Sequence, residues 1–138
     1  MKISTLMSYA HGFGGASQEI VELEKAGLDV VWVPEAYSFD AVSAMGYLAA
    51  KTERITIASG ILNIYSRTPS LLAMTAAGLD ELSNGRFMLG LGASGPQVVE
   101  GFHGVPYDAP VTRIREIVEI CRNVWLREDK LNYAGKKY

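Results

Sequence analysis

Short apolar segments and helical patterns alternate four times along the chain, and this alternation restricts the fold more than any other feature of the sequence. The apolar segments have the length of strands and cover residues 3–7, 29–33, 55–59 and 87–89. The helical patterns follow them at residues 17–25, 41–51, 69–82 and 111–126. Such alternation is typical of an α/β protein whose parallel strands are joined by right-handed crossovers. We therefore predict four β-α units in one parallel sheet.

Capping residues mark the starts of the predicted helices. Ser17 is predicted to cap the first helix, after a flexible loop at residues 8–15, and Asp40 is predicted to cap the second. Thr68 supplies a capping hydroxyl directly before Pro69, and proline is favoured at the first position of a helix. These boundaries leave each apolar segment free to form a strand of the sheet.

Two architectures fit this pattern: an open doubly wound sheet and part of a (β/α)₈ barrel. A whole barrel takes about 250 residues, so a chain of 138 residues can supply about half of one. In both architectures, ligands bind at the carboxyl ends of the strands. Here those ends are rich in glycine, polar and aromatic residues, and they comprise residues 7–11, 34–37, 60–65 and 92–97. We expect the functional site at these ends.

The fourth strand leads into a loop with the glycine spacing of a dinucleotide-binding fingerprint, at Gly90, Gly92 and Gly95. That fingerprint requires a long helix from its third glycine and an acidic residue at a strand end about 20 positions later. Here Pro96 follows, little helix fits before Gly101, and the acidic position falls within a helical pattern. A dinucleotide site is therefore disfavoured. The remaining interpretations are a tight turn and a loop whose bare backbone approaches a flat ligand.

Charge and composition argue against nucleic acid and membranes as partners. The chain has a formal net charge of −2, without a basic cluster, and its apolar runs are shorter than a membrane span. Its single cysteine, Cys121, excludes an internal disulfide and lies on the apolar face of the last helical pattern, where packing is its expected role. We expect a cytoplasmic protein that binds a small-molecule substrate and no metal.

Four longer motifs carry a resemblance to a known family. They are VWVPE at residues 31–35, SGILNIYSRTP at 59–69, NGRFMLGLGASGPQ at 84–97 and EGFHGVPY at 100–107. In order and spacing these motifs closely resemble the luciferase-like monooxygenase family, in particular its coenzyme F420-dependent branch, which includes the methylenetetrahydromethanopterin reductase-like enzymes. The resemblance spans essentially the whole chain and covers the N-terminal half of a family member. It implies one partial (β/α)₈ barrel domain over residues 1–138, in a family of usually dimeric enzymes that hold F420 or FMN.

The resemblance also implies where the cofactor binds. The implied cofactor-binding residues are Gly60, Ile61, Asn63, Gly92, Ala93, Ser94 and Gly95. A cis peptide bond between Gly60 and Ile61 would form a bulge behind the deazaflavin ring, with Asn63 in the same loop. The backbone of residues 92–95 would face the ring. We expect F420 in this site, with FMN as the alternative cofactor.

Glu35 and His11 are the candidate catalytic residues. Glu35 lies where the branch often has an acidic residue near cofactor and substrate, and His11 lies on the loop after the first strand. Alternatively, Glu35 pairs with Arg67 or caps backbone amides, and His11 is only solvated. One F420-dependent relative has a catalytic histidine after the acidic residue, whereas this chain has Ala36, which argues against a sugar-phosphate reaction. Tyr65 either shapes the ring pocket or belongs to the core.

Three functional hypotheses follow. The leading one is hydride transfer between F420 and an organic substrate, and the second is FMN-dependent monooxygenation. The third is a non-catalytic half barrel, either self-associating or a fragment of a longer enzyme, because a half barrel exposes two sheet edges and an open core face. We expect a homo-oligomer that associates through the helices at residues 41–51 and 69–82, with little or no turnover by this chain alone.

Overall fold

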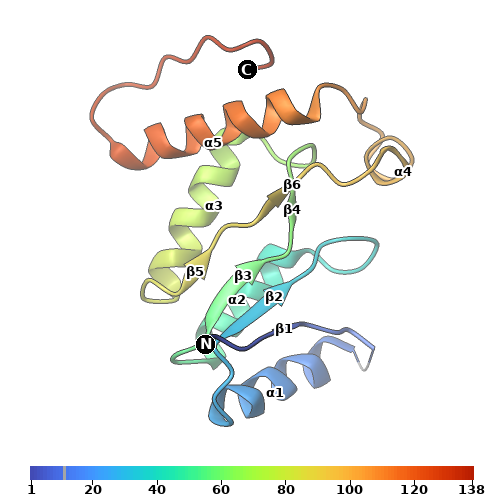
Figure 1. Cartoon of the computed structure of the whole chain (residues 1–138), viewed down its shortest axis with the longest axis vertical. Helices are drawn as coiled ribbons and strands as arrows, with labels where there is room; N and C mark the ends of the chain where they lie inside the picture. The colour runs from blue at the N-terminus through green and yellow to red at the C-terminus, as the bar shows by residue number, and fades with distance from the viewer. Residues whose placement is uncertain (11) are drawn as a thin grey trace. The chain divides into compact units, whose positions relative to one another are not determined.

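The computed structural model describes residues 1–10 and 12–138, which form two compact units (Figure 1). The first unit comprises residues 1–62 and 78–90, and the second comprises residues 63–77 and 91–138. The candidate residue His11 lies outside the described residues. Within the described ranges, no helix is both long enough and apolar enough to cross a membrane.

The first unit contains a four-stranded parallel sheet. Its strands are β1 (Ser4–Leu6), β2 (Val30–Val33), β3 (Thr56–Ser59) and β5 (Phe87–Met88). Their spatial order, β1-β2-β3-β5, follows the chain, and Figure 1 shows the first three side by side in blue to green. A doubly wound dinucleotide-binding sheet instead reverses its direction of growth at the first strand. The observed order confirms the parallel α/β prediction and is the order of consecutive barrel strands.

β2 lies in the interior of this sheet, between β1 and β3. Val31 is paired with Thr5 on one side and with Ile57 on the other. Three of the four residues of β2 are buried, as the nearly continuous apolar run predicts. The outer strand β1 is more exposed, with an exposed residue at each end.

The helices of the first unit begin with α1 (Gly12–Lys25) and α2 (Ala41–Lys51). The predicted start of α1 is wrong, because the helix begins at Gly12 and Ser17 lies inside it. The Ser17 hydroxyl donates to the Gly14 carbonyl at 2.9 Å, as serines inside helices do, whereas a capping serine accepts a backbone N–H. Asp40 caps α2 as predicted, and its Oδ2 accepts the Ser43 N–H at 2.7 Å.

α2 packs against β2 and β3 and closes the core of the first unit. The buried apolar side chains of these elements are Val30, Val31, Val33, Ala41, Ala44, Met45, Leu48, Ala49, Ile57 and Ala58. Small side chains alternate with large ones on α2, so the helix can approach the sheet closely. Burying one large aliphatic side chain contributes about 2 kcal/mol, so this layer contributes substantially to the stability of the unit.

Two charged side chains fasten the amino-terminal end of this sheet. The buried Glu24 carboxylate accepts N–H groups from Arg54 at 2.7 Å and from Ile55 at 2.8 Å, just before β3. Burial by itself would raise the pKa of Glu24, but these backbone hydrogen bonds and the charge of Arg86 together hold it below its usual value. The Arg86 guanidinium donates to the carbonyls of Ala49 and Thr52 near the end of α2, and to two further carbonyls.

The second unit is built on the long helix α5 (Pro110–Leu126) and the first part of α3 (Pro69–Leu82). Trp125 donates its Nε1–H to the Ala73 carbonyl at 3.0 Å, and Cys121 lies buried with Sγ 3.8 Å from the Pro69 carbonyl. This confirms the expected packing position of Cys121, and burial raises the pKa of its thiol. The C-terminal residues run back along α5 (Figure 1), where the Glu116 carboxylate accepts the N–H groups of residues 136–138.

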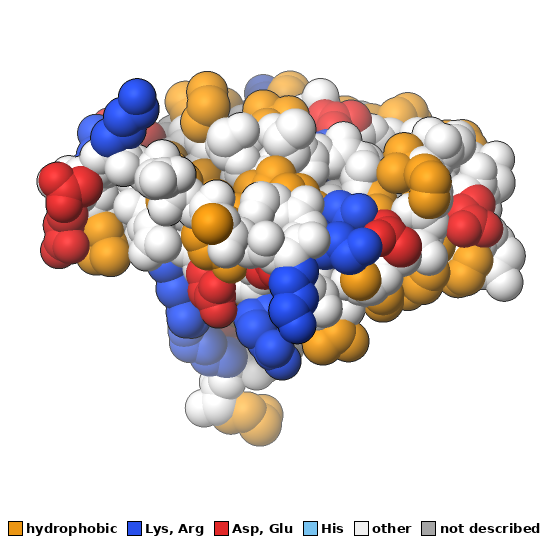
Figure 2. All heavy atoms as spheres, turned by 90° about the horizontal axis from the view of Figure 1, so that it is seen from above, with side chains coloured by type: hydrophobic (Ala, Val, Ile, Leu, Met, Phe, Trp, Pro, Cys, Tyr) orange, Lys and Arg blue, Asp and Glu red, His pale blue; other side chains and the backbone are white. Residues whose placement is uncertain are grey.

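Two short strands were not predicted. β4 (Leu62–Asn63) and β6 (Leu91–Gly92) form a separate two-stranded sheet, in the segments predicted only as loops after the third and fourth strands. Two residues are too few to produce a periodic apolar pattern. The short helix α4 (Pro96–Val99) follows β6, as the single helical turn expected there. Over the face drawn in Figure 2, basic and acidic side chains lie interspersed among apolar ones, so this face carries charge of both signs.

Candidate functional site

The carboxyl end of β3 is held by a reciprocal pair of hydrogen bonds. Ser59, the last residue of β3, is 0% exposed. Its Oγ donates to the Gly90 carbonyl at 2.8 Å and accepts the Gly90 N–H at 2.8 Å. Just beyond, the Gly60 N–H donates to the Val33 carbonyl at 2.8 Å, and the Leu62 N–H donates to the Gly90 carbonyl at 2.9 Å. Residues 59–62 are therefore tied both to the end of β2 and to the chain that follows β5.

Glycine is required at one position of this arrangement and is tightly packed at a second. A Cβ on Gly90 would lie 2.1 Å from the Ser59 carbonyl oxygen, which is part of the backbone and cannot easily move. A Cβ on Gly60 would lie 3.2 Å from the Trp32 Cβ. The peptide bond between Gly60 and Ile61 is cis, as the resemblance implied.

Asn63, three residues after Gly60, has a side-chain hydrogen-bond donor without a partner among the described residues. The side chain is 2% exposed, and its Oδ1 accepts the Tyr65 N–H at 2.9 Å. Its Nδ2 is buried and has no hydrogen-bond partner among the described residues. Buried amide donors are nearly always paired in folded proteins. This donor is therefore a candidate contact for a ligand with an acceptor atom.

Of the other predicted cofactor residues, Gly92 ends β6 and its carbonyl accepts the Ile64 N–H at 3.0 Å, whereas Ala93, Ser94 and Gly95 follow the strand. Ser94 is exposed and has a positive φ of 54°, and Gly95 precedes α4 in an extended conformation. The Tyr107 hydroxyl donates to the Ser94 carbonyl at 3.4 Å. The segment thus presents backbone polar groups with small side chains, as a loop that contacts a flat ring requires.

Glu35 and Tyr9 lie after neighbouring strands of the first unit. Oε1 of the half-buried Glu35 accepts the Ala41 N–H at 3.1 Å, so this carboxylate does cap a backbone amide at the start of α2. The Tyr9 hydroxyl, after β1, is buried without a hydrogen-bond partner in the described part of the chain. Burial and the nearby charges of Glu35 and Asp40 raise the pKa of Tyr9. The Tyr9 ring also meets Phe39 edge to face, with the ring centroids 5.2 Å apart.

Sequence patterns gave no signal for Tyr9 or for the pairing of Ser59 with Gly90. Hydroxyl groups at strand ends are common, and the pairing joins residues 31 positions apart in the chain. The sequence leaves two roles open for Tyr65, a pocket residue or a core residue. Its hydroxyl donates to the Asp108 carbonyl at 2.7 Å, and its ring lies beside that of Tyr107, so its observed contacts are structural.

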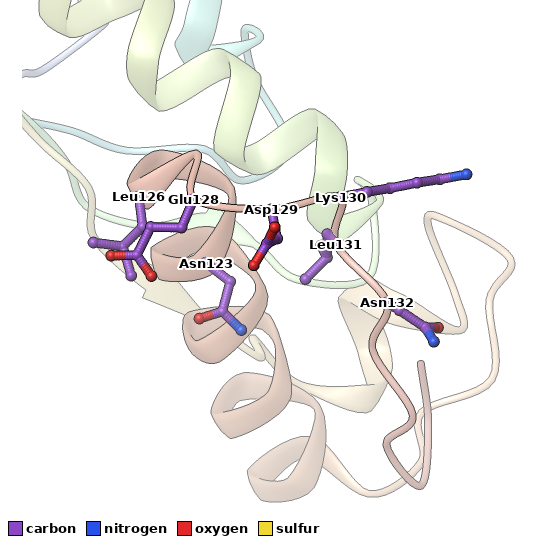
Figure 3. Close-up of a pocket in the computed structure, with 7 residues that line it drawn as sticks. All are labelled: Asn123, Leu126, Glu128, Asp129, Lys130, Leu131 and Asn132. Atoms are coloured by element: carbon purple, nitrogen blue, oxygen red, sulfur yellow. The ribbon is translucent and has the colours of Figure 1, made fainter.

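The predicted site residues are divided between the two units. Gly60, Ile61 and Glu35 belong to the first unit, whereas Asn63 and residues 92–95 belong to the second. A hollow of about 170 Å³ lies elsewhere in the second unit, where α5 ends (Figure 3). Its lining residues are Asn123, Leu126, Glu128, Asp129, Lys130, Leu131 and Asn132. None of them is a predicted site residue, and their side chains are largely polar.

The chain resembles known proteins in sequence over nearly its whole length. Residues 2–138 match the family model described as luciferase-like monooxygenase. Rv3520c of Mycobacterium tuberculosis, whose name describes a proposed coenzyme F420-dependent oxidoreductase, is 41% identical over 119 residues. The match covers 86% of this chain and 34% of that protein, so the chain spans about a third of the length of this curated relative.

Solved structures show the same fold. The coenzyme F420-dependent tetrahydromethanopterin reductase from Methanopyrus kandleri superposes with a TM-score of 0.82 at 25% identity, over 99% of this chain and 42% of that one. The oxygenating constituent of 3,6-diketocamphane monooxygenase from Pseudomonas putida, in complex with FMN, superposes with a TM-score of 0.85 at 21% identity. That match covers 100% of this chain and 43% of the other.

Proposed function

The chain belongs to the luciferase-like monooxygenase family, and from that premise we propose that its strand ends bind the planar ring of coenzyme F420 for hydride transfer to or from an organic substrate. The choice of F420 is supported by the names of Rv3520c and of the Methanopyrus kandleri reductase, since both specify this coenzyme. When bound, the deazaflavin ring supplies a carbon centre that accepts or donates a hydride.

The unsatisfied donor of Asn63 is the observation that carries this proposal. Because Oδ1 accepts the Tyr65 N–H, the orientation of the amide is fixed, and its unpartnered Nδ2 hydrogens are available to a ligand. A deazaflavin ring presents carbonyl and nitrogen acceptors along one edge. An acceptor supplied by the ring would satisfy the donor and remove the cost of burying it unpaired, about 1–3 kcal/mol.

Backbone groups would provide the remaining ring contacts. Gly60 and Ile61 would back one face of the ring, so that the substrate approaches from the other face. The backbone of residues 92–95 would face its polar edge, because the small side chains there allow a ring to approach closely. We also propose that Glu35 and His11 contact the substrate. Glu35 already holds the start of α2 through the Ala41 N–H, so it would orient the substrate from a fixed position.

Ring binding can be tested with two chromophores that lack a phosphate. The chain is titrated into hydroxydeazariboflavin, the F420 ring with its ribityl chain, and in parallel into riboflavin, with fluorescence as the readout. We expect the deazaflavin to bind at least about tenfold more tightly, a difference of about 1.4 kcal/mol. Binding of riboflavin alone would favour FMN-dependent monooxygenation instead, and binding of neither ring would refute a ring site at these strand ends.

An Asn63→Asp variant tests the contact itself. Above about pH 8 the carboxylate keeps an oxygen for the Tyr65 N–H but cannot donate, so the deazaflavin dissociation constant should rise about tenfold. Asn123→Asp makes the same chemical change on the exposed part of α5 and should leave binding within about twofold. Equal effects of both variants would mean that Asn63 does not contact the ring.

A further inference from the structure

We propose that Ser59 is a positioning residue for the ring: its hydroxyl fixes the backbone of residues 60–62, against which the deazaflavin rests. This inference rests on the proposed function and deepens it, because it names the side chain that holds the ring-facing loop. Ser59 itself is 0% exposed, so it acts through the loop and not by touching the ligand.

The two hydrogen bonds between Ser59 and Gly90 form a closed pair. One hydroxyl donates to the Gly90 carbonyl and accepts from the N–H of the same residue, both at 2.8 Å. A hydroxyl is the smallest side-chain group that can donate and accept at once. Because Gly90 lacks a Cβ, its backbone approaches closely enough for both bonds to form.

The Gly90 carbonyl transmits this constraint to the loop. It accepts the Leu62 N–H at 2.9 Å as well as the Ser59 hydroxyl, so one oxygen holds both flanks of the Gly60–Ile61 peptide. The Gly60 N–H is bound to the Val33 carbonyl at 2.8 Å, and Trp32 fills the space beside Gly60. The loop therefore has little freedom to shift while the Ser59 bonds are intact.

The chain contains a matched control for Ser59. Ser83 is also buried, at 1% exposure, and its Oγ donates to the Asp80 carbonyl and accepts the Arg86 N–H, both at 3.1 Å. It precedes β5, however, whereas Gly90 follows this strand, so Ser83 lies at the amino-terminal side of the sheet. Its bonds have the same chemistry without a connection to the ring-facing loop.

The test compares Ser59→Ala, Ser83→Ala and Ser59→Cys with the unchanged chain, at a temperature where all four are folded. For Ser59→Ala we expect the dissociation constant of hydroxydeazariboflavin to rise about tenfold, with a changed absorption spectrum of the bound ring. Ser83→Ala should bind within about twofold of the unchanged chain, although both alanine variants lose thermal stability. Ser59→Cys keeps a weak donor and should give an intermediate affinity.

Amide hydrogen exchange supplies a readout without ligand. In Ser59→Ala the N–H groups of Gly60 and Leu62 should exchange at least about tenfold faster, whereas those within β2 should not change. Unchanged exchange at both positions overturns the proposal. So does equal ring affinity of Ser59→Ala and the unchanged chain, and in that case the proposed function still stands. If the unchanged chain binds no ring at all, the proposed function fails and this inference fails with it.

Discussion

Replacing Gly90 with alanine should disrupt the contact between the ends of β3 and β5. The new Cβ would lie 2.1 Å from the Ser59 carbonyl oxygen and 3.3 Å from its carbonyl carbon. Ordinary carbon–oxygen contacts are about 3.3–3.6 Å long. The distance from the new Cβ to the Ser59 oxygen is shorter than this by more than 1 Å. The two strand ends must therefore separate. That movement breaks both hydrogen bonds between Ser59 and Gly90.

The expected loss of stability follows from two contributions. Overpacking costs about 1–3 kcal/mol, and two lost hydrogen bonds add about 1 kcal/mol each. Their sum, about 3–5 kcal/mol, is a large part of the total stability of a domain, which is about 5–15 kcal/mol. In a thermal unfolding experiment followed by circular dichroism, Tm should fall by roughly 10 °C or more.

Gly78→Ala is the control for this substitution. Gly78 lies within α3, and a Cβ there would meet nothing within 4 Å. Because alanine favours the helix, this variant should unfold at the same or a slightly higher temperature, with a gain of at most about 1 kcal/mol. Equal melting temperatures of the Gly90→Ala and Gly78→Ala variants would refute the steric reasoning. Failure of Gly90→Ala alone to fold would support it.

Four further predictions concern other parts of the chain. Glu24→Gln should lower the free energy of unfolding by about 2 kcal/mol near pH 7. Because the folded pKa of Glu24 is lowered, its contribution is complete above the unfolded pKa and disappears as the pH falls through the folded one, so urea titrations below the folded pKa should show a much smaller difference. Arg86→Lys should cost about 3 kcal/mol in urea titrations, because an ammonium group cannot reach all four carbonyls that the guanidinium binds. Tyr9→Phe should increase the free energy of unfolding by about 1 kcal/mol, seen as a higher melting temperature. The substitution removes a buried hydroxyl that lacks a partner among the described residues. Light scattering should show self-association of the chain that weakens in Met74→Asp, because Met74 on α3 is 67% exposed; a monomer at all concentrations would contradict this.

Local patterns predicted the strands, their parallel arrangement and most helix boundaries. A strand such as β2 is apolar at almost every position, and the Asp40 cap acts on a residue only three positions away. Thr68 likewise caps α3 through the Leu71 N–H at 3.2 Å. These signals are readable because the interacting groups are close in the chain. The wrong start of α1 has the same origin, since a serine inside a helix and a serine at its cap are alike in sequence.

The details of the candidate site depend on contacts between distant residues. The pairing of Ser59 with Gly90 and the resulting β4 and β6 strands join two segments that are about 30 positions apart in the chain. No local pattern specifies such a contact. The capping of Ala41 by Glu35 crosses a loop whose conformation was not predictable, so it could be stated only as one of several alternatives. The resemblance supplied the candidate residues, and the structure supplied the hydrogen bonds that distinguish them.

The glycine spacing at residues 90, 92 and 95 resembles a dinucleotide fingerprint, but its surroundings differ from those of such a site. Gly90 is needed because the strand ends approach too closely for a Cβ. Gly95 precedes α4 in an extended conformation, at φ −130° and ψ 164°. α4 has only 4 residues, so too few peptide dipoles are aligned to bind a pyrophosphate at its amino terminus. Close strand packing therefore accounts for Gly90, other residues can also adopt the extended backbone of Gly95, and the short α4 argues against a pyrophosphate site.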